Sequence, residues 1–151
     1  MSNTQAMCTS FKGELLTGTH NFGTGVVRAS TAADTFKAAL YLDSATINAS
    51  TTAYTTTGEV SGSGYTAGGV TVTFGTPPST SGTTAFVTPS ASITYSAVTL
   101  STAFDCVLIY NSSQSDKAVS VHTFGSQTVT AGTFTLTMPV NDASTGLIRL
   151  A

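Results

Sequence analysis

DTFKAALYLDSATINASTTAYTTTGEVSGSGYTAGGVTVTF, residues 34 to 74, predicts a strand, a long ordered loop and a second strand. At its start, apolar and more polar positions alternate with a period of two, which is typical of a half-buried strand. The apolar positions there are Phe36, Ala38, Leu40 and Leu42. The segment GVTVTF, residues 69 to 74, repeats the alternation and predicts the second strand.

The loop between these strands is rich in Thr, Ser and Gly, but it has residues that can anchor it. After Asp43 it carries a single charge, Glu59, and two aromatic rings, Tyr54 and Tyr65. We therefore expect an ordered loop. Its glycine-rich part, GSGYTAGG, lacks the GK[ST] ending of a phosphate-binding loop, so we expect these glycines to supply positive φ angles or tight turns.

Composition limits the possible classes of protein. A chain of 151 residues is long enough for one domain that buries roughly two-thirds of its unfolded surface. Charged residues make up 8% of the chain, against about 25% in an average protein. The five Lys and Arg residues are scattered singly, so nothing favours nucleic-acid binding.

Residues 1 to 33 are expected to form an irregular N-terminal arm, and residues 34 to 151 a single β domain. SFKGELL can form a short amphipathic helix with Phe11 and Leu15 on its apolar side and Ser10 as its N-cap. A brief strand is expected at residues 26 to 28. The arm packs either on its own domain or on a neighbouring subunit, and the sequence leaves both open.

Short strands separated by Gly, Pro, Ser, Thr or Asn follow the organising stretch. Strands are expected at 84 to 87, 92 to 100, 104 to 110, 117 to 124 and 146 to 150, and as a pair of short strands around an Ala-Gly turn within 128 to 140. FDCVLIY is nearly continuously apolar and predicts a central strand, with KAVSVHTF as its antiparallel partner. Residues 75 to 84 are expected to be a turn-rich connection. The fold class is therefore all-β: an antiparallel β-sandwich or jelly-roll-like domain.

The residues that carry enzyme chemistry form no recognised motif. His20 and His122 are the only imidazoles, and His122 is expected to be a surface or interface residue. Asp105 interrupts an apolar strand and is expected to face polar surface. Cys8 and Cys106 are expected to be thiols rather than a disulfide. The prediction is a non-enzyme with no cofactor and no metal site.

The N-terminal segment MSNTQAMCTSF lacks the features of a secretory signal, and no apolar run reaches the roughly 18 residues that span a bilayer. We expect a protein made in the cytoplasm that does not interact with a membrane.

The segments TTAYTTTGEVSGSGYTAGGVT (51 to 71), SFKGELLTGTHNF (10 to 22) and TFTLTMPVNDASTGLIRL (133 to 150) resemble a family of small virion proteins encoded in tailed-bacteriophage genomes. The resemblance extends from Ser10 to Leu150. It implies a structural protein of the virion, assembled in the host cytoplasm.

Within the virion, the expected role is a capsid cement or decoration protein that bridges subunits of the major capsid protein. A homo-oligomer, a dimer or a trimer, is expected as well. The candidate interface residues are Phe11, Leu15, Tyr54, Glu59, Tyr65 and Tyr110. For the tyrosines, packing beneath their own loops is the alternative. The rival functions are a neck or tail component and a carbohydrate- or receptor-binding head-fibre module, the latter disfavoured by the absence of Trp.

Overall fold

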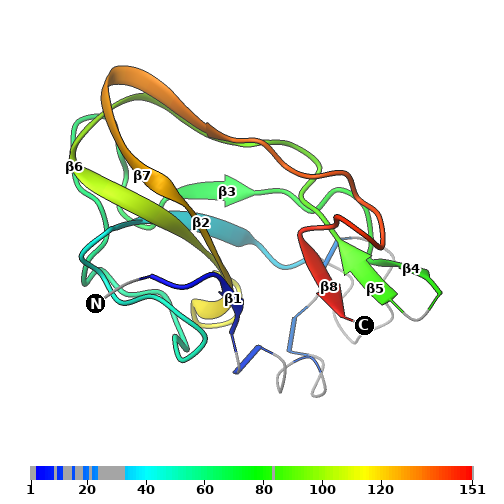
Figure 1. Cartoon of the computed structure of the whole chain (residues 1–151). Helices are drawn as coiled ribbons and strands as arrows, with labels where there is room; N and C mark the ends of the chain where they lie inside the picture. The colour runs from blue at the N-terminus through cyan, green and yellow to red at the C-terminus, as the bar shows by residue number, and fades with distance from the viewer. Residues whose placement is uncertain are drawn as a thin grey trace.

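The chain folds into an all-β sandwich of two antiparallel sheets (Figure 1). The structure, a computed structural model, describes residues 3 to 8, 10, 11, 15, 19, 20, 22, 23, 33 to 82 and 84 to 150. The larger sheet has the strand order β1-β7-β6-β2-β3, and the smaller sheet has the order β4-β5-β8. The strands are β1 (Ala6–Met7), β2 (Phe36–Leu42), β3 (Val70–Val72), β4 (Ser79–Ser81), β5 (Thr84–Val87), β6 (Ile93–Asn111), β7 (Lys117–Leu136) and β8 (Ile148–Leu150). The predicted antiparallel sandwich is confirmed; its jelly-roll form stays a prediction.

One long hairpin dominates the larger sheet. The strands β6 and β7 have 19 and 20 residues; β6 replaces two of the predicted short strands, and β7 replaces three. The predicted Ala-Gly turn is also wrong, because Ala131 lies inside β7, at a bend where its φ is 45°. Register shifts at several points along the pair let the ribbon bend without ending, which is the usual effect of β-bulges.

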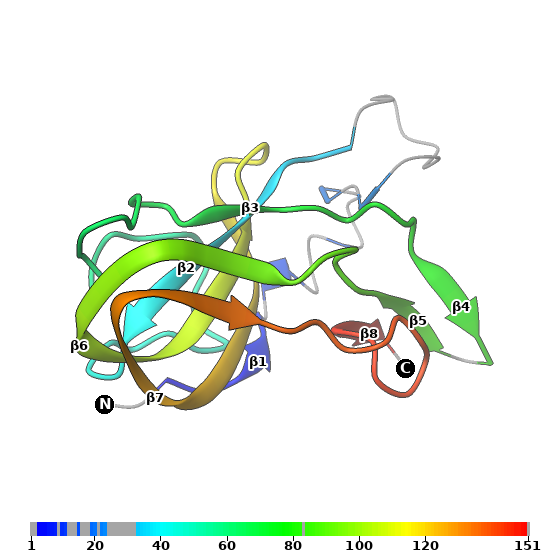
Figure 2. The same cartoon turned by 90° about the horizontal axis from the view of Figure 1, so that it is seen from above.

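The bending divides the hairpin into two halves. The inner half lies next to the turn that joins β6 to β7, and the outer half contains the beginning of β6 and the end of β7. Figure 2 shows β6 and β7 curving together as one ribbon, and the beginning of β6 returns over β2, where the Tyr95 hydroxyl donates to the carbonyl of Ala38. The inner half of β6 is the predicted central strand, and its residues 106 to 111 are all buried. The outer half still packs on the core through alternate side chains, including Val129 and Phe134.

The smaller sheet begins inside the segment expected to be a connection. Ser79–Ser81 pairs with Thr84–Val87 as a short hairpin, so that expectation is wrong for β4. The three side chains of β4 are exposed, which is why no apolar alternation marks the strand in the sequence. The predicted strands at β5 and β8 are confirmed, and the two pair through Ala85 to Val87.

The strand β2 is buried on both faces, rather than on one as its alternation indicated. Ala39 and Tyr41, on the face expected to be polar, are completely buried. The long loop after β2 covers this face through Thr55, whose carbonyl accepts a hydrogen bond from the Tyr41 hydroxyl. It also pairs with the edge of the strand: the amide of Val60 donates to the carbonyl of Leu40, and Tyr41 forms an isolated bridge with Glu59. The loop therefore acts as a part of the sandwich, as expected of an ordered segment.

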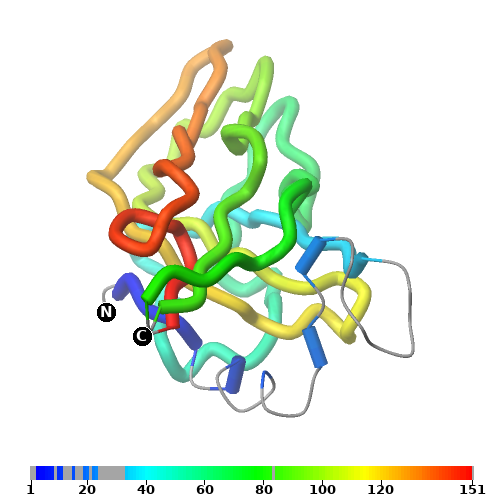
Figure 3. Tube along the Cα trace, turned by 90° about the vertical axis from the view of Figure 1, so that its right-hand side faces the viewer, coloured from blue at the N-terminus to red at the C-terminus, as the bar shows by residue number. Residues whose placement is uncertain are grey.

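The described residues of the arm pack on their own chain. Cys8, Phe11 and Phe22 are buried, and β1 pairs with β7. Residues 5 to 7 lie beside Leu147 and Ile148 (Figure 3). Three smaller expectations have different outcomes. Ser10, Phe11 and Leu15 have helical backbone. The N-cap role of Ser10 is wrong, because an N-cap residue has non-helical backbone, and among the described residues its buried hydroxyl has no hydrogen-bond partner. The strand expected at 26 to 28 lies outside the described residues.

Candidate functional site

Glu59 holds the long loop together from inside. Its carboxylate accepts hydrogen bonds from the hydroxyls of Tyr54 and Tyr65 and from the amide of Gly68, each at 2.7 Å. Short hydrogen bonds to an ionised acceptor are about twice as strong as neutral ones. A single carboxylate thus ties together three points of the loop.

The other three tyrosines of the chain surround the same carboxylate. Tyr110 stacks on Tyr54 with ring centroids 4.8 Å apart, and Tyr95 stacks on Tyr65 at 6.0 Å. The hydroxyls of these tyrosines donate to backbone carbonyls: Tyr41 to Thr55, Tyr95 to Ala38 and Tyr110 to Gly68. We call this group, Glu59 with Tyr41, Tyr54, Tyr65, Tyr95 and Tyr110, the Glu59–tyrosine cluster.

Burial and the charge of Glu59 act together on these phenols. Burial is the largest cause of the raised pKa of Tyr65 and of Tyr54, and the hydrogen bond to Glu59 is the second. The pKa of Tyr110 rises from 10.0 to about 12, first through burial, then through the charges of Asp116 and Glu59. Burial also raises the pKa values of Tyr41 and Tyr95. At neutral pH all five phenols therefore keep their protons, and two of them, Tyr54 and Tyr65, donate to Glu59.

Glycines allow the loop to lie directly on the strands beneath it. A Cβ atom on Gly69 would meet the carbonyl oxygen of Ala38 at 1.7 Å, and one on Gly62 would meet that of Thr99 at 2.0 Å. The φ angle of Gly69 is also positive, at 73°. The glycine-rich segment is therefore a close-packing device between backbones, in agreement with the expectation of positive φ and against a phosphate site.

Four of the six candidate interface residues meet in the Glu59–tyrosine cluster: Tyr54, Glu59, Tyr65 and Tyr110. Tyr110 is buried, and the other three are partly buried. The hydrogen bonds and ring contacts described above lie within the chain, which corresponds to the alternative of packing beneath their own loops. Tyr41 and Tyr95 were missed by the sequence reasoning. These two tyrosines belong to the Glu59–tyrosine cluster because of the way the strands pair, and strand register cannot be read from the sequence pattern.

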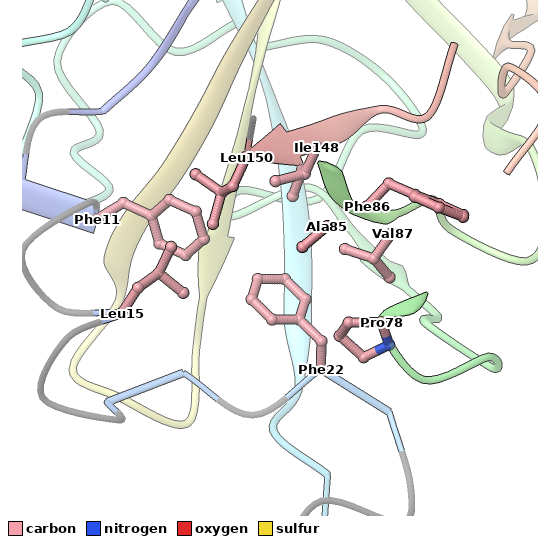
Figure 4. Close-up of a pocket in the computed structure, with 9 residues that line it drawn as sticks. All are labelled: Phe11, Leu15, Phe22, Pro78, Ala85, Phe86, Val87, Ile148 and Leu150. Carbon is pink, nitrogen blue, oxygen red and sulfur yellow. The ribbon is translucent and has the colours of Figure 1, made fainter. Parts of the chain in front are cut away.

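The remaining two candidates, Phe11 and Leu15, line an apolar pocket between the arm and the smaller sheet (Figure 4). The sheet contributes Ile148 and Leu150 from β8 and Ala85 and Val87 from β5. Phe22, Pro78 and Phe86 complete the lining. The pocket has a volume of about 90 Å³, well below the roughly 300 Å³ of the smallest typical ligand sites. It has room for a small apolar side chain.

The outer half of the hairpin presents a surface made of hydroxyl groups. Its exposed threonines are Thr94 and Thr102 on β6 and Thr128, Thr130, Thr133, Thr135 and Thr137 on and just after β7. We call this surface the threonine face. The bend at Ala131 shifts the alternation by one residue, so threonines stay outward on both sides of it. Residues 93 to 104 and 124 to 140 contain no charged side chain.

The two histidines and Asp105, the residues considered above for catalysis, contact polar side chains of the same chain. The imidazole of His122 lies 2.9 Å from the hydroxyl of Ser120, and burial lowers its pKa from 6.5 to about 4. His20 is buried, with its Nδ1 3.0 Å from the amide nitrogen of Asn111. Asp105 accepts a hydrogen bond from Asn3. Within the described ranges, no three His, Cys, Asp or Glu side chains gather in a group able to hold a metal ion.

Both cysteines are buried thiols. Burial raises the pKa of the Cys106 thiol to about 12, and the charge of Asp105 adds to this effect. A thiol with so high a pKa is a poor nucleophile. The expectation of thiols rather than a disulfide agrees with this arrangement.

In the part of the chain that the structure describes, no helix is long and apolar enough to cross a membrane.

Comparisons of the chain with known proteins found no relative. No family model, no characterised protein and no solved structure matches the chain.

Proposed function

We propose that this protein is a structural component of a tailed-bacteriophage virion, and specifically a cement protein that binds the outside of the head and bridges major capsid protein subunits. The resemblance of residues 10 to 150 to small phage virion proteins provides the class. The observation that carries the choice of a cementing role is the threonine face, because it is extended, exposed and free of charged residues.

A cement protein needs a stiff body and a surface that makes many moderate contacts. The stiffness comes from the long β6–β7 hairpin and from the loop clamped by Glu59. Hydroxyl groups can donate and accept hydrogen bonds and are cheaper to desolvate than charges. The threonine face therefore suits a wet interface repeated over a shell.

The apolar pocket offers a second point of attachment. Leu150, which lines the pocket, is 41% exposed. An apolar side chain of a neighbouring subunit would cover the rim and occupy the pocket. A homo-oligomer around a symmetry axis of the head is part of the same proposal.

The first test is the copy number of the protein relative to the major capsid protein in purified virions. A ratio within a few-fold of one-to-one is expected for a cement protein. A ratio of a few per cent would instead indicate the neck or tail, where connectors occur in about a dozen copies.

The second test is mechanical. Heads that lack the protein should rupture at a lower temperature, and adding the purified protein back should restore the temperature. Thr128→Glu and Thr133→Glu should weaken binding to such heads about tenfold or more, because each would bury a charge at the interface. The matched control is Ser50→Glu, an exposed loop position outside the threonine face. Equal binding by all three variants would exclude this face as the attachment surface.

A further inference from the structure

A second surface feature lies beside the threonine face and differs from it in composition. It is a cleft of about 450 Å³ between the glycine-rich loop, β3 and the beginning of β6. This volume falls within the range of roughly 300 to 1,000 Å³ typical of small-ligand sites. The cleft exists because Gly64 brings the loop against the β6 backbone, where a Cβ atom would lie 2.2 Å from the carbonyl oxygen of Ala97.

One partly buried aromatic ring, Tyr65, gives the cleft an apolar wall, and Tyr95, which is only 2% exposed, supports that ring. Tyr65 and Tyr95 both line it and stack on one another. Their hydroxyls donate to Glu59 and to the carbonyl of Ala38, so each phenol is held in place by its polar end. The accessible part of the wall is therefore mostly ring carbon of Tyr65. Such a wall suits the C–H face of a sugar ring.

Polar groups of two kinds surround this wall. Thr71, Thr94 and Ser96 are exposed and line the cleft, and they place three hydroxyls around it. Among the described residues that line the cleft, Lys37 is the one that is charged. Its ammonium is near the loop, since a Cβ atom on Gly68 would lie 3.8 Å from the Lys37 Nζ. The cleft thus combines an aromatic wall, neutral hydroxyls and one cation.

We propose that this cleft binds a sugar ring that carries a carboxylate, of the uronic-acid type. The Lys37 ammonium pairs with the carboxylate, the hydroxyls of Thr71, Thr94 and Ser96 bond to the sugar hydroxyls, and the tyrosine wall contacts the apolar face of the ring. This binding does not depend on the cement role. In a protein at the surface of a phage head, it would hold the particle weakly to acidic polysaccharide, and many copies would add their affinities.

The test is a titration of the isotopically labelled full chain, followed through its amide NMR signals, with glucuronate as the probe. Glucose tests the ring without the charge, and acetate tests the charge without the ring. Glucuronate is expected to shift the amides of Gly64, Gly69 and Thr71 with a dissociation constant in the millimolar range, about 1 to 10 mM. Glucose and acetate should bind at least about fivefold more weakly.

Two variants complete the design. Lys37→Gln should weaken glucuronate binding about three- to fivefold and leave glucose binding unchanged. Lys117→Gln removes a lysine at the far end of the hairpin and should change neither affinity. Three results would overturn the proposal: no shifts at the cleft with glucuronate, shifts equal to those with acetate, or an unchanged affinity in Lys37→Gln. None of these results bears on the copy number or on head stability, so the cement role is tested separately.

Discussion

Replacing Glu59 by Ala should destabilise the fold more than any other exchange of a single carboxylate among the described residues. The change removes the acceptor of three hydrogen bonds, from Tyr54, Tyr65 and Gly68. A donor left unsatisfied in a dry interior costs about 1 to 3 kcal/mol. Glu59, Tyr54 and Tyr65 are partly exposed, so water can reach the vacated site and the lower figure applies.

The sum is a loss of about 3 kcal/mol in the free energy of unfolding, close to 1 kcal/mol for each donor. For a domain of this size, 1 kcal/mol lowers the melting temperature by about 2 to 4 °C, so a decrease of about 6 to 12 °C is expected. Glu59→Gln keeps the shape and one acceptor oxygen but loses the charge. It should cost about 1 to 2 kcal/mol.

Urea denaturation followed by tyrosine fluorescence is the appropriate assay, because the chain has no Trp and its tyrosines lie around Glu59. The control is Asp43→Asn, an exposed carboxylate at the end of β2, which should change stability by less than about 0.5 kcal/mol. A double-mutant cycle of Glu59→Ala with Tyr54→Phe should give a coupling of about 1 kcal/mol. The reasoning is refuted if Glu59→Ala and Asp43→Asn unfold at the same urea concentration.

Three other predictions concern pH and backbone packing. The pKa of Tyr110 is about 12 in the folded chain and 10.0 ordinarily. As pH rises, the Tyr110 phenol therefore loses its proton first in the unfolded chain, and the free energy of unfolding should fall above about pH 10. If phenolate absorbance increased well before the chain unfolded, this prediction would be contradicted. The pKa of His122 is lowered from 6.5 to about 4, so the unfolded chain binds a proton first. Stability should then fall by about 1 to 3 kcal/mol between pH 6.5 and 4, a slope that His122→Gln should reduce in urea titrations. Gly62→Ala would place a Cβ atom 2.0 Å from the Thr99 carbonyl oxygen and should lower the free energy of unfolding by more than about 2 kcal/mol. Gly125→Ala, whose Cβ atom would have no other atom within 4 Å, should change it by less than about 0.5 kcal/mol. Equal melting temperatures of the two variants would show that the loop does not need this close approach.

Local patterns in the sequence determined the fold class and the positions of most strands. Alternating and continuous apolar runs are produced by burial along a single strand, so they can be read without knowing the partner strand. The central strand at 104 to 110, its return strand and the last strand at 146 to 150 were all predicted on this basis. Glu59, Tyr54 and Tyr65 also stood out from composition alone, because they are rare residue types in a loop of Thr, Ser and Gly.

Only the tertiary structure decided how these parts combine. The bend at Ala131 replaces a predicted turn, because bulges in the pairing with β6 allow the ribbon to continue. The polar strand β4 has no apolar signal of its own and is stabilised by pairing with β5. Tyr41 joins the Glu59–tyrosine cluster from β2, and Tyr95 and Tyr110 join it from β6 by stacking on Tyr65 and Tyr54. A sequence pattern records the burial of each residue along one strand, whereas strand register and long-range contacts depend on which segments meet, and that is fixed when the whole chain packs.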